Sequence, residues 1–437
     1  MPGTDLSRTV QNSAAFPQGV LPVKSSLSRG RFVAGTAGAA ALTFGGGPYV
    51  IAAPTKELTI GLDVPQSGPY AEQGQDQLRA YHLAIEEINA KGGIMGMKIK
   101  SSEGDDQTKP GVATENAQRM IERDGAIMIT GGSSTGTAVA VSGLCQQKGV
   151  IFMATLTHGD ETTNQNCHKH TFRRYNDAYM SAQALAKTLV TKYGTGKWFH
   201  ITADYAWGHS VYDNITAVVE PKGAKTIKNV LTPFPGTKDF SPMLQQAQAA
   251  KPDVLVLTEF GADMVLCLNQ AAQFGLTKST KILVPLVDEY MAKGTKDNFD
   301  NVVSTAPFYW KYHAEKYPGA KKFVDAFQKR YGFPPSNGAE VAYADIYIYK
   351  MAVEKAGSTD AAKVIAVLEG TKFQFTKEEE WYRKEDHQGV NSCLVVEGIP
   401  ESQRGPGGFG YAKVLEVHAG PSVVAPLSSL ACKMEPA

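Results

Sequence analysis

Three segments of the chain place glycines and hydroxyl side chains directly after runs of apolar residues. They are residues 65–74 (PQSGPYAEQG), 130–136 (TGGSSTG) and 154–157 (ATLT). Glycine lets backbone N–H groups approach a ligand closely, and Ser and Thr hydroxyls add further donors. Donors at the start of a helix favour a carboxylate or a similar anion. Ser and Thr also cap helices very often, and a cap that faces a cleft can serve both purposes.

Catalysis has no comparable support in the sequence. A G-x-S-x-G elbow, an H-E-x-x-H pair and a GxxxxGK[ST] phosphate loop are all missing. The nine histidines are scattered. Residues 386–388 (DHQ) could form part of a proton relay, but a lone His beside an acid is more typical of a structural contact. We therefore predict that the chain is not an enzyme.

The cysteines, histidines and charges exclude two further classes of site. There is no C-x-x-C pair, and residues 167–170 (CHKH) lie on one short segment that cannot converge three ligands. We expect these four residues on the surface, and we expect no metal and no cofactor. The formal net charge of +1, from 44 basic and 43 acidic residues, lacks the clustered basic excess of a nucleic-acid-binding protein.

The first 53 residues are typical of an export signal rather than of a folded domain. Arg29 and Arg31 precede an uncharged stretch over residues 32–45, which is too short to span a bilayer and is followed by small residues. Gly30 separates the two arginines, so the twin-arginine and the general export routes both stay open. No later stretch is apolar enough to cross a membrane. We expect a soluble protein in the periplasm.

The rest of the chain alternates between strand and helix patterns. Apolar residues alternate over residues 57–64, which predicts a strand, and helical spacing follows over 75–90. Further strands are predicted at 97–102, 126–130, 150–154, 197–202, 253–258, 281–285 and 302–306, and further helices at 112–124, 178–193, 240–250 and 262–274. This rhythm predicts an α/β protein with parallel sheets covered by helices on both faces. One sheet of so many strands would be unusually wide, so we expect two doubly wound lobes, with ligands at the carboxyl ends of the strands.

Longer segments carry a resemblance to a known family. In chain order they are PQSGPYAEQG, INAKGGIMGMKI, GDDQTKPGVATENAQRMI, GVIFMAT, DYAWG, KDFSPMLQQAQAAKPDVLVL and AYADIYIYKMAVEKAG. Their order and spacing resemble the leucine/isoleucine/valine-binding family of periplasmic proteins, the type I solute-binding proteins of ABC importers. The resemblance extends over roughly residues 55 to 420.

The resemblance implies two lobes joined by three crossovers. Residues 55–173 and 306–380 would form the first lobe, and residues 174–305 and 381–425 the second. Residues 426–437 would then be a C-terminal tail. Such a protein is expected to act as a monomer, to close over a small solute and to present it to a membrane permease. A sensor or receptor domain of the same fold is the alternative.

The family pattern also suggests which residues meet the ligand. Its first lobe grips the carboxylate of an amino acid through hydroxyls and backbone N–H groups, and its second lobe supplies cleft aromatics and an acid for the amino group. Carried onto this sequence, those positions are Gln73, Gly132, Ser133, Ser134, Thr155, Thr157, Trp207, Phe260 and either Asp288 or Glu289. An apolar amino acid is the expected solute, although Gln73 and Trp207 depart from the usual pattern. An aromatic acid or a small amide is the alternative.

Five cysteines in an exported chain predict one or two disulfides. Cys393 lies near the start of the last expected crossover, and Cys432 lies in a tail that tethering would order. We predict a Cys393–Cys432 bond, although spacing alone does not fix the connectivity.

Overall fold

Five strands in the first part of the chain pair as an all-parallel sheet in the order β2-β1-β3-β4-β5. The computed structural model describes residues 56–434, so the predicted signal segment (1–53) lies outside the described part. The strands are β1 (Glu57–Val64), β2 (Lys98–Asp105), β3 (Ala126–Gly131), β4 (Ile151–Ala154) and β5 (Thr171–Arg173). Side chains on both faces of β1 are buried, which is what helices on both faces of a parallel sheet require.

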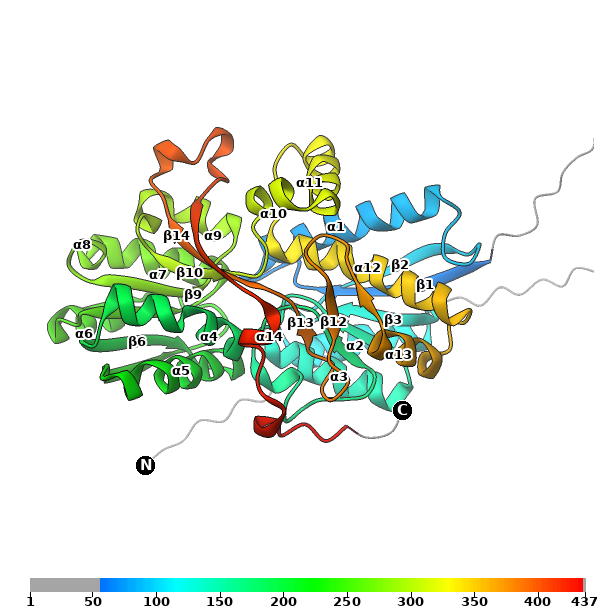
Figure 1. Cartoon of the computed structure of the whole chain (residues 1–437), viewed down its shortest axis with the longest axis horizontal. Coiled ribbons are helices and arrows are strands. Elements are labelled where there is room, and N and C mark those ends of the chain that lie inside the picture. Colours follow the sequence, from blue (N-terminus) through cyan, green and yellow to red (C-terminus); the bar gives the residue numbers. More distant parts are fainter. Residues whose placement is uncertain (1–55, 435–437) are drawn as a thin grey trace, which may run out of the picture. The chain divides into compact units, whose positions relative to one another are not determined.

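Helices from two distant parts of the chain cover this sheet (Figure 1). On one face α1 packs against α12, and on the other α2 packs against α3. The helices of this first lobe are α1 (Ala71–Ala90), α2 (Pro110–Glu122), α3 (Thr135–Lys148), α10 (Trp310–Lys316), α11 (Pro318–Tyr331), α12 (Asn337–Ala356) and α13 (Ala361–Gly370).

The second lobe is built on a seven-stranded sheet in the order β15-β14-β10-β9-β8-β6-β7. Its strands are β6 (Lys197–Ala203), β7 (Lys225–Thr232), β8 (Val254–Thr258), β9 (Lys281–Leu286), β10 (Val303–Ala306), β14 (Cys393–Gly398) and β15 (Ala412–His418). Its helices are α4 (Ala178–Thr188), α5 (Ala206–Val219), α6 (Ser241–Ala250), α7 (Gly261–Gln273), α8 (Leu276–Ser279), α9 (Glu289–Thr295) and α14 (Gly420–Val423). The strands β14 and β15 are antiparallel to their neighbours and close one side of an otherwise parallel sheet.

The chain passes between the lobes three times, after β5, after β10 and after β13. A small antiparallel sheet precedes the third passage and consists of β11 (Lys372–Phe373), β12 (Glu380–Tyr382) and β13 (Gly389–Val390). The expected lobe boundary between residues 380 and 381 therefore falls inside β12. All the predicted strands and helices are present, with ends that differ by a few residues, whereas β5, β7 and β11–β15 were not predicted.

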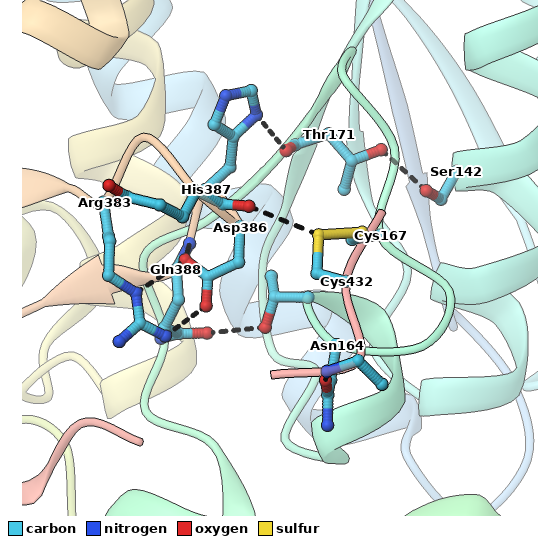
Figure 2. The surroundings of a disulfide bond; sticks show 12 residues. Ser142, Asn164, Cys167, Thr171, Arg383, Asp386, His387, Gln388 and Cys432 are labelled. Carbon is cyan, nitrogen blue, oxygen red and sulfur yellow. Dashed lines mark hydrogen bonds and ion pairs between the residues drawn. A yellow bond between two sulfur atoms is a disulfide. The ribbon is translucent and has the colours of Figure 1, made fainter. Parts of the chain in front are cut away.

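The predicted Cys393–Cys432 bond is wrong. Cys432 is bonded to Cys167, and Cys393 is a free thiol buried in β14 of the second lobe (Figure 2). After α14, which packs against α4, the tail returns to the first lobe, where the backbone N–H of Ala431 donates to Asn164 at 2.6 Å. The expectation that residues 167–170 are surface residues also needs correction, because Cys167 and His170 are buried.

The disulfide therefore joins the C-terminal tail, which follows the last strand and helix of the second lobe, to the first lobe. Figure 2 shows the bond beside the loop that carries Arg383, Asp386 and His387, and the Cys432 sulfur lies 3.4 Å from the carbonyl oxygen of Glu385. It is a fourth covalent link between the lobes, added to the three crossovers. Within residues 56–434, no helix combines the length and the apolar character needed to cross a bilayer.

Candidate functional site

A small cavity lies between the two lobes. Every residue that lines it is at or just beyond the carboxyl end of a parallel strand, which is where doubly wound sheets bind ligands. The lining residues are Tyr70, Ser133, Thr135, Leu156 and His158 from the first lobe and Tyr205, Trp207, Phe260 and Leu286 from the second.

Three helices begin at the wall of this cavity. α3 begins at Thr135, α5 begins between Tyr205 and Trp207, and α7 begins directly after Phe260. The first N–H groups of a helix have no partner inside the helix, and the helix dipole makes that end attractive to an anion. The N-cap side chains of α5 and α7 make no capping hydrogen bond. The start of a helix from each lobe therefore brings backbone N–H groups to the cavity wall, of which the Thr137 N–H is bonded to Ser134 and the Ala262 N–H to Pro69.

Aromatic rings frame the cavity. The rings of Tyr70 and Phe260 meet edge to face with centroids 5.2 Å apart, and those of Trp207 and Phe260 do so at 6.2 Å. Tyr205 stacks on Phe234 at 3.8 Å, with only 11° between the ring planes. Such ring pairs fix one another's orientation, so aromatic surface bounds the cavity.

The polar atoms that line the cavity are uncharged. Burial, reinforced by the nearby charge of Arg173, lowers the pKa of His158 to about 3, so its ring is neutral, and its Nε2 pairs with the Ser181 hydroxyl at 3.1 Å. The Thr135 hydroxyl accepts from the backbone N–H of Gly159 at 3.0 Å. The indole Nε1 of Trp207 is buried and has no hydrogen-bond partner among the described residues.

Of the residues suggested by the sequence, Ser133, Trp207 and Phe260 line the cavity. Ser133 also accepts a hydrogen bond from the side-chain amide of Gln77 at 3.0 Å. Six further cavity residues were not predicted, and four of these, Tyr70, Thr135, Leu156 and Tyr205, lie inside segments that the sequence had singled out. His158 directly follows the third of those segments, so its position was the available signal.

The remaining first-lobe candidates have contacts of their own away from the cavity lining. Ser134 caps α3, because its hydroxyl accepts from the Thr137 N–H and the Thr137 hydroxyl accepts from the Ser134 N–H. The Thr155 hydroxyl pairs with Tyr81 at 2.6 Å, and the Thr157 hydroxyl pairs with Thr162 at 3.3 Å.

Gly132 has a φ of +71°, which favours glycine over other residues. A Cβ atom there would come within 2.9 Å of the Phe152 ring, so glycine also allows this loop to pack closely. The position therefore shapes the loop that carries Ser133.

Gln73 and Asp288 contact each other across the lobes. The Gln73 Nε2 donates to Asp288 Oδ2 at 2.8 Å, and the other oxygen of Asp288 caps α9 by accepting from the Met291 N–H at 2.8 Å. Burial raises the pKa of Asp288 to about 6. Glu289 is also buried, and neither of its carboxyl oxygens has a hydrogen-bond partner among the described residues.

Further contacts hold the lobes together at the mouth of the cavity. The hydroxyls of Tyr70 and Tyr205 are 2.7 Å apart, and the Ala262 N–H donates to the Pro69 carbonyl at 3.0 Å. The Tyr290 hydroxyl adds a hydrogen bond to Asp76 at 2.6 Å. These contacts describe a closed form, in which water has little access to the cavity.

A larger pocket lies at the other end of the second sheet, near the amino ends of its parallel strands, next to Tyr193, Lys281 and Asn301. One lobe alone lines it, so a movement of the lobes would not enclose a solute there. Within residues 56–434, no three side chains of His, Cys, Asp or Glu are grouped closely enough to hold a metal ion.

Comparison with known proteins identifies the family of the chain. Residues 57–403 match the family model described as periplasmic binding protein. The chain belongs to this family. A curated relative, Leu/Ile/Val-binding protein homolog 7 from Brucella abortus, is 29% identical over 326 residues, which are 71% of this chain and 80% of the relative.

Two solved structures show the same fold. A periplasmic binding protein from Burkholderia mallei superposes with a TM-score of 0.80 at 26% identity, covering 87% of this chain and 99% of that one. A solute-binding protein of an ABC transporter from Rhodopseudomonas palustris, solved in complex with 3,4-dihydroxybenzoic acid, has a TM-score of 0.76 at 23% identity and covers 85% and 99%. The expected α/β fold of two lobes is thereby confirmed.

Proposed function

We propose that the chain is the periplasmic solute-binding component of an ABC importer and that it captures one small carboxylate-bearing solute between its lobes. The observation that carries this proposal is the enclosed cavity lined by both lobes, at which α3, α5 and α7 begin. Helix N-termini favour an anion, and a small cavity lined by both lobes suits a small molecule rather than a peptide.

The names of the relatives agree with a carboxylate. The Brucella protein is named for leucine, isoleucine and valine, and the Rhodopseudomonas structure contains 3,4-dihydroxybenzoic acid. These four compounds differ in size, in shape and in their other polar groups, but each has a carboxylate attached to an apolar body. The donors at the cavity wall match that shared group.

The binding mechanism follows from the residues that line the cavity. In the open form the solute meets the hydroxyls of Ser133 and Thr135 on the first lobe. Closure then brings Tyr205, Trp207 and Phe260 over it, which excludes water and strengthens the polar contacts. The closed form presents surfaces of both lobes to the permease, and opening there releases the solute.

Thermal unfolding against a panel of small carboxylates tests the proposal. A ligand at 100 times its dissociation constant adds about 2.7 kcal/mol to the stability of the folded state. We expect such a gain in the parent and its loss in Trp207→Ala. Trp381→Ala, a half-buried tryptophan of β12 outside the cavity, is the control and should keep the gain. If no carboxylate stabilises the parent, or if the gain survives Trp207→Ala, the proposal is wrong.

A further inference from the structure

The lining of the cavity has no carboxylate that could pair with an ammonium ion. An amino acid enclosed between the lobes would bring a charged amino group into a site of low dielectric, where an unpaired charge is very costly. None of the nine lining residues is an Asp or a Glu, and the one base among them, His158, is neutral. The question is therefore whether an acid just behind the lining could reach the solute.

Asp288 is the nearest acid along the chain to a lining residue of β9, because it follows Leu286 by two positions. Both of its oxygens are already engaged, one by the Met291 N–H and the other by the side-chain amide of Gln73. The amide of Gln73 takes the place that a solute's amino group would need. Asp288 thus joins the lobes instead of facing the cavity.

Two other acids lie close to lining residues and are poor partners for a cation. Glu259 precedes Phe260, is buried, and accepts from the Thr232 hydroxyl at 2.5 Å. Burial raises its pKa to about 8, so it is mostly protonated at neutral pH. Burial and the neighbouring Asp288 raise the pKa of Glu289 well above its usual range. Neither Glu259 nor Glu289 lines the cavity.

The groups that do face the cavity suit an anion with a flat body. Three helix N-termini meet at its wall, and the buried Nε1 of Trp207 is a donor without a partner among the described residues. Among the lining residues, His158 also has a ring nitrogen without a partner, its Nδ1, whereas the unpartnered ring nitrogens of Trp198, His200 and His313 belong to residues outside the cavity lining. The edge-to-face pair of Tyr70 and Phe260 bounds the apolar part of the space.

We infer that the solute is a small carboxylate without an amino group, with a planar apolar body as in benzoate. The inference rests on the proposed function and narrows it from small carboxylates in general to this class. The donors of α3, α5, α7 and Trp207 would meet the carboxylate, and the rings of Tyr70, Phe260 and Trp207 would enclose the body.

Matched pairs of ligands that differ only in the amino group test the inference by isothermal titration calorimetry at pH 7. The pairs are 3-phenylpropanoate with phenylalanine and 4-methylpentanoate with leucine, and benzoate is measured alongside. Because leaving a buried charge unpaired is strongly unfavourable, we expect the acid of each pair to bind roughly 100-fold more tightly than the amino acid. Benzoate should bind at least as well as either acid.

The outcomes separate the inference from the function on which it rests. If the amino acids bind as tightly as their deaminated partners or more tightly, the inference is overturned while the carboxylate-binding function stands. If neither member of any pair binds and benzoate also fails, the proposed function falls and the inference falls with it.

Two variants locate the carboxylate contact. Trp207→Phe keeps an aromatic ring and removes Nε1, so benzoate affinity should fall roughly tenfold, as expected for one hydrogen bond to a charged group. Trp198→Phe makes the same change at a buried tryptophan outside the cavity and should alter the affinity less than twofold. Asp288→Asn should leave benzoate binding nearly unchanged. Equal losses in the two tryptophan variants, or a large loss of benzoate binding in Asp288→Asn, would contradict the assignment.

Discussion

Breaking the bond between Cys167 and Cys432 should destabilise the whole protein, not only its tail. The two cysteines are 265 residues apart in sequence, so the bond closes a loop that contains the whole second lobe and the later part of the first lobe. Replacing either cysteine by alanine opens that loop in the unfolded state. It also frees the tail after α14, which hydrogen-bonds to Asn164 beside the disulfide.

The size of the effect can be worked out from the loop. Chain entropy predicts that closing a loop of this length stabilises the folded state by about 5.6 kcal/mol at 25 °C, which is an upper bound. In the variant, the released tail gains conformational freedom in the folded state, which offsets part of this loss of stability. Measured contributions of disulfides to stability are typically about 2 to 4 kcal/mol. For a chain of this length the entropy of unfolding is about 0.8 kcal/mol per kelvin, so the melting temperature should fall by roughly 3 to 5 °C.

The assay is differential scanning calorimetry of Cys167→Ala, Cys432→Ala and the double variant. Because each change breaks the same bond, all three should melt at the same temperature, and adding a reductant should lower the parent to that value. Cys393→Ala serves as a control, because it removes a buried thiol and leaves the bond in place, so reductant should still lower its melting temperature. A double variant that melts well below both single variants, or a parent that is insensitive to reductant, would refute the reasoning.

Three further predictions concern contacts between or beside the lobes. Tyr70→Phe and Tyr205→Phe should each weaken solute binding by roughly 1 kcal/mol, and the double variant should lose less than the sum in a calorimetric cycle, because the two hydroxyls bond to each other. Arg174→Met leaves the buried carboxylates of Glu340 and Glu380 without their partner and should cost roughly 3 to 5 kcal/mol in urea unfolding. Burial raises the pKa of Asp288 to about 6, so the stability that this residue contributes is complete below about pH 4 and is lost as the pH rises through 6. Urea unfolding between pH 4 and 8 should therefore show a decline in the stability of the parent, and Asp288→Asn should flatten that decline.

The fold could be predicted where burial of one or both faces of an element gives the apolar residues a regular spacing in the sequence. The strand over residues 57–64 was predicted with its observed ends, because its apolar side chains alternate and glycine and proline follow soon after. The strands β14 and β15 were missed because they are antiparallel additions from the end of the chain, with no helix between them to mark a repeat. The pairing of Cys432 was missed because it depends on the path of the tail in space.

The site was predictable as a location but less so as a list of contacts. Each segment that the sequence singled out provides at least one cavity residue: Tyr70, Ser133 and Leu156 are examples. Which hydroxyl faces the cavity depends on the direction of each side chain, and Thr155 instead lies in a buried network with Tyr81. The engagement of Asp288 by Gln73 joins residues 215 positions apart, and no local pattern reports such a contact.

The packing of α1 against α12 has a consequence for how the chain is made. These helices lie at residues 71–90 and 337–356, so the core that they share cannot close until most of the polypeptide has left the ribosome. The sheet of the second lobe is completed later still, because β10 pairs with β14 at residues 393–398. Contacts of such long sequence separation form slowly. Neither lobe can therefore complete its core until most of the chain has been synthesised, and until then each leaves apolar surface accessible to chaperones.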